Sequence, residues 1–135
     1  MSEKRTGHRV AVLPAEDLLV EVRIGGLPVA SSRRPVLVYE TGMPVRYYLP
    51  PQDVDLSLFS GTATETSCPF KGTASYWAFH GGAPAASAEG PGTEVAWSYQ
   101  RPLDSVAAIG GHLAFYDDRA EITVTGEPPV PAGRD

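Results

Sequence analysis

The sequence predicts a single domain of the all-β class. Its 135 residues suit one hydrophobic core. Short segments of alternating, β-branched or aromatic residues follow one another, separated by glycine and proline turn signals, and we expect roughly eight strands. Only one or two segments suit a short helix, and strands do not alternate with helices as in a nucleotide-binding doubly wound sheet. These observations favour an antiparallel sandwich, barrel or related fold.

The first half of the chain is expected to contain four main strands. Residues 1–17 are predicted to be an N-terminal tail with a possible first edge segment near its end. Apolar residues then alternate with polar ones over residues 18–24, and two glycines predict a hairpin turn into residues 27–32. Two β-branched and aromatic segments supply the next strands, residues 35–40 and 45–49.

The second half is expected to be organised in the same way, with two short helices between its strands. Consecutive prolines predict a short helix or 3₁₀ turn from Pro51, and a proline near the first turn predicts a second helix over residues 102–108. Residues 60–67 are polar and are expected to lie outside the strands, as is the Gly- and Pro-rich loop 80–92. Strands are predicted at residues 73–79, 93–99, 112–116 and 120–125, followed by a Pro-rich tail at 126–135.

Composition and charge exclude several classes of protein. A formal net charge of -5, with both signs interspersed, argues against binding to nucleic acid or to a membrane surface. Cys68 is the only cysteine, so an intramolecular disulfide and a multi-cysteine zinc site are excluded. The first residues contain no apolar stretch after their charges and no long apolar run occurs elsewhere, so we expect neither export nor a membrane span. We therefore expect a cytoplasmic protein without a metal or other cofactor.

Several short motifs, taken in order, resemble those of one protein family. They are Glu40-Thr-Gly42, the segment 46–50, Cys68-Pro-Phe-Lys-Gly72, the segment 96–99 and residues 109–116. Together they resemble the family called domain of unknown function 427, DUF427, over a domain of residues 18–125. The resemblance implies a compact, tent-like antiparallel fold in which two sheets splay apart around a cleft. It implies no agreed activity, and the cysteine pairs that bind metal in folds of that shape are absent.

Three residues are candidates for catalysis. Lys71 is one of two lysines, and beside Gly72 it could serve as an anion anchor, a Schiff-base donor or a general base. Cys68 could act as a nucleophile with its pKa lowered by the nearby ammonium, or it could simply pack in the core. Glu40 ends an apolar strand and could pair with Arg46 or Lys71, or lie at a solvated strand end.

Other residues are candidates for binding a ligand. Arg46 could face the same cleft as Glu40. Most of the aromatic side chains are expected in the core, but Tyr48, Trp97 and Tyr99 have polar groups and small neighbours, as expected for the wall of a small-molecule site. The predicted ligand-binding set is thus Arg46, Tyr48, Lys71, Trp97 and Tyr99.

The leading hypothesis is a domain that binds an unidentified small polar or anionic molecule in this cleft. A second hypothesis is a small enzyme that uses the same cleft, with Lys71 or Cys68 as the reactive group and Glu40 as acid or base. A third is a protein-interaction module, which would expose an apolar patch rather than a cleft. The sequence leaves the oligomeric state open.

Overall fold

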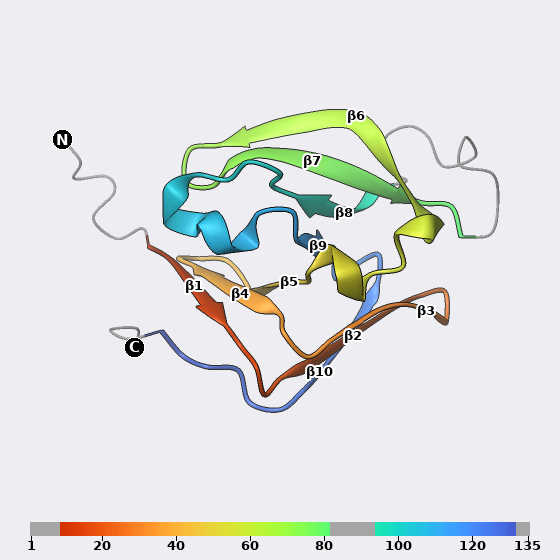
Figure 1. The fold of residues 1–135 in the computed structure, drawn as a ribbon, viewed down its shortest axis with the longest axis horizontal. Coiled ribbons are helices and arrows are strands. Elements are labelled where there is room, and N and C mark those ends of the chain that lie inside the picture. Colours follow the sequence, from red (N-terminus) through yellow and green to blue (C-terminus); the bar gives the residue numbers. More distant parts are fainter. Residues whose placement is uncertain (1–8, 82–93, 132–135) are drawn as a thin grey trace.

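The all-β prediction is confirmed by a computed structural model that describes residues 9–81 and 94–131. These residues form ten strands and three short 3₁₀ helices (Figure 1). The strands are β1 (Val10–Pro14), β2 (Leu19–Ile24), β3 (Leu27–Ser32), β4 (Val36–Glu40), β5 (Arg46–Tyr48), β6 (Phe59–Cys68), β7 (Gly72–Phe79), β8 (Glu94–Ser98), β9 (Leu113–Phe115) and β10 (Glu121–Thr125). The helices are η2 (Pro51–Asp53), η3 (Leu56–Leu58) and η5 (Asp104–Ile109).

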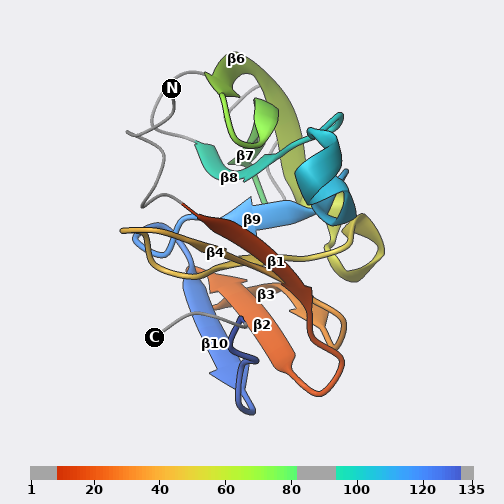
Figure 2. The same ribbon diagram turned by 90° about the vertical axis from the view of Figure 1, so that its left-hand side faces the viewer.

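The strands pair into three antiparallel sheets, in the orders β1-β4-β5, β10-β2-β3 and β6-β7-β8-β9. The β1-β4-β5 sheet lies between the other two in both views (Figures 1 and 2). The hairpin predicted at the two glycines is present as β2 and β3. Among the described residues, no sheet closes into a barrel.

A seam between Leu49 and Leu113 joins two of the sheets. The amide of Leu49 donates to the carbonyl of Leu113 at 2.8 Å, and the amide of Leu113 donates back at 2.9 Å. Leu49 follows β5 and Leu113 begins β9, and each is 1% exposed. The strands β1-β4-β5 and β9-β8-β7-β6 therefore form one strongly bent layer, and β10-β2-β3 forms the other. The family resemblance implies two splayed sheets, and the described residues form three sheets, two of which meet at this seam.

Strand β4 is buried on both faces, because it separates two hydrophobic clusters. Leu37 points into the cluster shared with β2 and β3. Its neighbours Val36 and Val38 point the opposite way, into a second cluster lined by strands of the bent layer. The members of the second cluster include Tyr48, Ala74, Trp97, Tyr99, Val106, Ile109 and Ala114.

One prediction about the strands was wrong. Residues 60–67, a polar stretch expected to lie outside the strands, form most of β6, the longest strand described. This strand lies at the edge of its sheet, and most of its residues are exposed, so no apolar alternation marks it. Its β-branched Thr62, Thr64 and Thr66 recur at every second position, which was the available signal.

The remaining elements follow the prediction closely. The edge segment expected near the N-terminus is β1, which pairs with β4. The helix expected near Pro51 appears as η2 and η3, and η5 occupies most of the segment expected to be the second helix. Most of the predicted 80–92 loop lies outside the described residues.

The chain after β10 makes a close approach that should depend on a glycine. Gly126 has a φ of +110°, and a Cβ atom there would lie 2.9 Å from the carbonyl oxygen of Asp17. Gly42 also has a positive φ, of +77°, but a Cβ atom there would meet nothing within 4 Å. Both positions have a positive φ, which disfavours a residue with a side chain, but only at Gly126 would an added Cβ atom also meet a neighbouring backbone atom.

We expect Gly126→Ala to lower the free energy of unfolding by about 2 kcal/mol, from left-handed backbone strain and from displacement of the Asp17 backbone. Gly42→Ala should cost about 1 kcal/mol, from backbone strain alone. Urea denaturation of both variants measures the difference. Equal losses would show that the contact with Asp17 adds nothing.

Candidate functional site

A cavity of about 190 Å³ lies where the second hydrophobic cluster opens to solvent. We call it the Lys71 cavity. Its walls combine charged groups, aromatic rings and a few apolar side chains drawn from five segments of the chain. The lining residues are Val38, Glu40, Met43, Pro44, Arg46, Tyr48, Lys71, Tyr76, Trp97, Tyr99 and Tyr116.

The strand period explains how these residues reach one face. Val38 and Glu40 are two positions apart on β4, so both side chains point to the same side. On β5 the same relation holds between Arg46, which is paired with Val38, and Tyr48. Along β4 the burial decreases from Val38 to Glu40. The cavity therefore lies at the polar, solvent-facing end of this face, and the other end of the face belongs to the apolar core.

The turn between β6 and β7 places Lys71 at this solvent-facing end. The amide of Lys71 donates to the carbonyl of Cys68, and its own carbonyl accepts a 3.0 Å hydrogen bond from Leu103. Gly72 has a φ of +117°, and a Cβ atom there would lie 3.2 Å from the carbonyl oxygen of Arg101. A side chain at position 72 would strain this contact, so Gly72 lets the turn dock against residues 101–103.

Lys71 and Glu40 form an ion pair on the cavity wall. The Nζ atom of Lys71 donates to Oε1 of Glu40, and the two side chains are only 10% and 15% exposed. Of the two partners expected for Glu40, Lys71 is the one that pairs with it. A cation and a carboxylate with little access to water are each stabilised by the other, and removing either leaves a poorly solvated charge.

Arg46 lies at the rim of the cavity. Its guanidinium is 5.3 Å from the centre of the Trp97 ring and 3.9 Å from Oδ2 of Asp117. The side chain is 25% exposed, more than that of Lys71. Arg46 therefore contributes a second cation that still reaches water.

Tyr48 and Trp97 connect the two sides of the bent layer. The indole Nε1 of Trp97 donates to the Tyr48 hydroxyl at 2.9 Å, and the rings meet edge to face with centroids 6.2 Å apart. Burial raises the pKa of Tyr48 to about 12, although the bond from Trp97 and the charge of Arg46 act in the opposite direction. The Tyr48 hydroxyl is therefore protonated at neutral pH.

Tyr99 is a largely buried residue that lines the cavity. The residue is 6% exposed. Its pKa is raised, mainly by burial and then by the nearby Tyr48, Cys68, Tyr76 and Glu40 groups. Within residues 9–81 and 94–131, the hydroxyl has no hydrogen-bond partner. Among the described residues, Nδ1 of His80 is the only buried side-chain atom without a partner, so the unpaired Tyr99 hydroxyl is accessible from the cavity and open to a ligand.

Sequence reasoning placed six residues in the cleft that the structure brings together: Glu40, Arg46, Tyr48, Lys71, Trp97 and Tyr99. The other five lining residues were not among the predicted site residues: Val38, Met43, Pro44, Tyr76 and Tyr116. Tyr76 is paired with Trp97 across β7 and β8, and Tyr116 lies two positions after Ala114, which is also opposite Trp97. Only the strand register, which the sequence does not give, shows that these tyrosines flank Trp97.

Cys68 does not line the Lys71 cavity. It is partly buried and packs against the second hydrophobic cluster at the end of β6. Its thiol still lies close enough to Tyr48 and Tyr99 to raise their pKa values. The packing role considered for Cys68 agrees with this position, and the expected place in a shared cleft does not.

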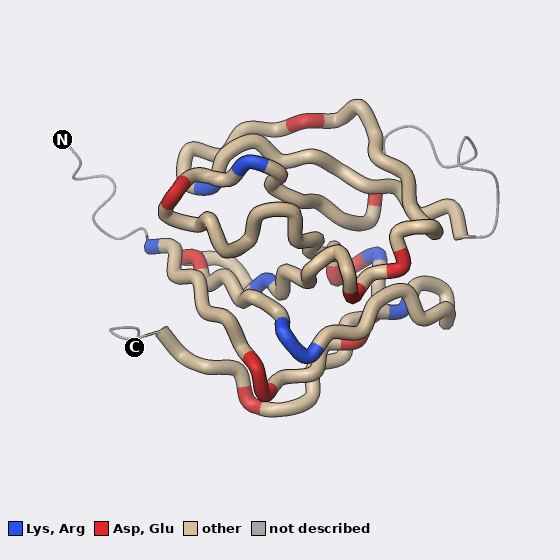
Figure 3. Tube along the Cα trace, viewed as in Figure 1, with Lys and Arg blue, Asp and Glu red and all other residues tan. Residues whose placement is uncertain are grey.

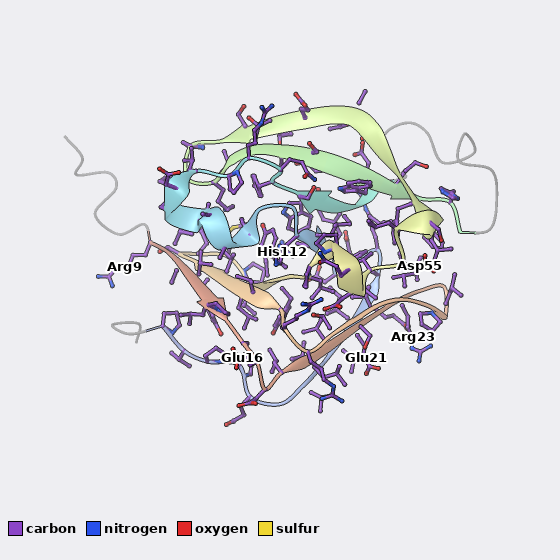
Figure 4. All side chains as sticks on the ribbon, viewed as in Figure 1. Arg9, Glu16, Glu21, Arg23, Asp55 and His112 are labelled. Atoms are coloured by element: carbon purple, nitrogen blue, oxygen red, sulfur yellow. The ribbon has the colours of Figure 1, made fainter. Side chains whose placement is uncertain are left out.

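Elsewhere on the described surface, charged and apolar side chains do not gather into a comparable site. Basic and acidic residues are interspersed along the described chain (Figure 3), and Arg9 and Arg23 project away from the fold (Figure 4). The large exposed apolar residues belong to separate segments: Leu27, Met43, Leu56, Leu103 and Val130. In the described ranges, no three His, Cys, Asp or Glu side chains are grouped to hold a metal ion. None of the helices described is long and apolar enough to span a membrane.

Comparison with known proteins identifies the family. A family model described as a domain of unknown function, DUF427, matches residues 13–126. The chain belongs to the DUF427 family. The match includes every strand from β2 to β10 and all the residues that line the Lys71 cavity. No curated protein matches this DUF427 chain.

Proposed function

We propose that this DUF427 domain binds a small polar or anionic molecule in the Lys71 cavity. The observation that carries the proposal is a lysine only 8% exposed in a cavity with aromatic walls. Burying the Lys71 ammonium costs free energy. A lysine whose only role was to form an ion pair could do so at the solvated surface without that cost. A concave, mostly apolar site with a few converging polar groups is typical of small-molecule binding.

A thermal-shift screen of metabolites tests this function, because a ligand that binds only the folded state raises its melting temperature. We expect at least one small anion to stabilise the protein, and Lys71→Met to weaken its affinity about tenfold by removing a charge-assisted hydrogen bond. Arg33→Met is the matched control, since Arg33 is exposed and lies outside the cavity. Equal shifts in the wild type and Lys71→Met for every stabilising compound would contradict the proposal.

The Lys71–Glu40 pair also favours a second candidate function, catalysis through Lys71. If Glu40 accepted a proton from the ammonium, the free amine could attack a ligand carbonyl and form an imine with loss of one water. Cyanoborohydride reduction in the presence of benzaldehyde would then trap the imine as a secondary amine on Lys71. A mass increase on Lys71 that Glu40→Gln greatly reduces would support this function, and labelling of exposed amines alone would oppose it.

A further inference from the structure

The polar groups of the Lys71 cavity are mostly hydrogen-bond donors. Lys71 and Arg46 are cations without acceptor capacity. The Tyr48 oxygen already accepts the indole N–H of Trp97, so its own proton is left for another partner. Tyr99 lines the cavity, and among the described residues its accessible hydroxyl has no hydrogen-bond partner. The one carboxylate in the lining, Glu40, is paired with Lys71.

Both tyrosines remain donors over the physiological range. Burial, the largest cause in each case, raises the pKa of Tyr48 to about 12 and raises that of Tyr99 as well. A neutral phenol donates strongly to an anionic oxygen, whereas a phenolate would repel it. A ligand that presents acceptor oxygens would therefore satisfy the two hydroxyls and the cations together.

We infer that the ligand is a small monocarboxylate with a flat apolar body, and that Tyr48 and Tyr99 determine its specificity by donating to the carboxylate. The inference rests on the proposed function, because it names the class of molecule that the same cavity takes. Lys71 and Arg46 supply the attraction, while the two hydroxyls distinguish a carboxylate from a neutral group of similar shape.

The charges in the cavity favour a monoanion over a phosphate ester. The two cations and the one carboxylate leave a single net positive charge, and Arg46 is also within 3.9 Å of Asp117. A phosphate monoester carries about -1.5 to -2 charges at neutral pH, so it would leave excess negative charge in a poorly solvated site. The lining comes from strands and turns rather than from a helix N-terminus, where phosphate groups are commonly bound.

The size and walls of the cavity favour a compact planar body. Sites for drug-sized ligands commonly occupy about 300–1,000 Å³, and this cavity of about 190 Å³ is smaller. Trp97 and Tyr116 lie with ring centroids 4.7 Å apart and form an aromatic wall. Val38, Met43 and Pro44 add apolar surface. A flat ring would contact these groups while its carboxylate reached the donors.

Isothermal titration calorimetry with four matched probes tests the inference: benzoate, benzamide, phenyl phosphate and benzylamine. We expect benzoate to bind about tenfold more tightly than benzamide and phenyl phosphate, and benzylamine to bind most weakly. Tyr99→Phe and Tyr48→Phe should each weaken benzoate about tenfold, because each removes a hydrogen bond to a charged group. The same variants should change the affinity for benzamide much less.

Tyr47→Phe is the matched control, since Tyr47 is on the same strand as Tyr48 but packs against the other hydrophobic cluster. Tyr99→Phe is the decisive variant, because Tyr48→Phe also removes the acceptor of Trp97. Tighter binding of phenyl phosphate or benzylamine than of benzoate would overturn the carboxylate inference and leave the cavity as a binding site. Absence of binding by all four probes at millimolar concentration, together with a metabolite screen that gives no Lys71-dependent shift, would overturn the proposed function as well.

Discussion

Replacing Leu113 by alanine is expected to lower the free energy of unfolding by about 3 kcal/mol, within the usual range for a leucine in a packed core. Leu113 is 1% exposed and lies in the hydrophobic cluster shared with β2 and β3. Its backbone also forms the reciprocal hydrogen bonds with Leu49 that join β5 to β9. A smaller side chain there leaves a cavity beside the seam between β5 and β9.

Urea denaturation and thermal melting of Leu113→Ala measure this loss. For a domain of this size, 3 kcal/mol corresponds to a decrease in melting temperature of about 10 °C. Leu103→Ala is the matched control, because Leu103 is 43% exposed and its substitution should change the stability by less than about 1 kcal/mol. Similar losses in the two variants would show that the seam is not a centre of stability.

The sequence predicted the strands in which the pattern of apolar side chains reflects which faces are buried. In β2 the alternation of apolar and polar residues reflects one buried face, and in β4 the continuous apolar run reflects burial on both faces. Strand β6 shows no such pattern, since most of its residues are exposed. It is held by backbone pairing with β7 and by threonine hydroxyls that bond to Glu94 and Tyr76. An exposed edge strand is specified by pairing, which a search for apolar periodicity does not detect.

The candidate site likewise contains residues that the sequence could identify and relationships that only the structure reveals. Lys71 and Glu40 could each be selected by residue type and motif, but they are 31 positions apart, and their pairing depends on how β4 and the β6–β7 turn meet. Tyr76 and Tyr116 could not be distinguished from core aromatics without the register beside Trp97. Cys68 was prominent in the motif, yet packing against the core explains its place better than chemistry in the cavity.

The Lys71–Glu40 pair has two consequences that act in opposite directions. The carboxylate holds the ammonium in place, so it supports the folded state. It also neutralises the cation that an anionic ligand would meet, and so it limits the affinity for that ligand. A substitution that removes the charge of Glu40 but keeps its shape should separate the two consequences.

Glu40→Gln is therefore expected to lower the free energy of unfolding by about 3 kcal/mol, since it leaves Lys71 as a poorly solvated cation without its partner. The same variant should bind benzoate about threefold to tenfold more tightly, because the carboxylate of the ligand then compensates Lys71. Urea denaturation with and without benzoate measures both effects, and added benzoate should recover more stability in the variant than in the wild type.

Glu65→Gln is the matched control. Glu65 is exposed on β6 and lies outside the cavity lining, so its substitution removes the same formal charge without altering the site. It should alter neither the stability nor the affinity for benzoate by more than a small amount. Weaker benzoate binding by Glu40→Gln would mean that Glu40 orients Lys71 toward the ligand rather than competing with it. In that case the ion pair would act as one binding unit, and removing its negative charge would disrupt the geometry on which the cation depends.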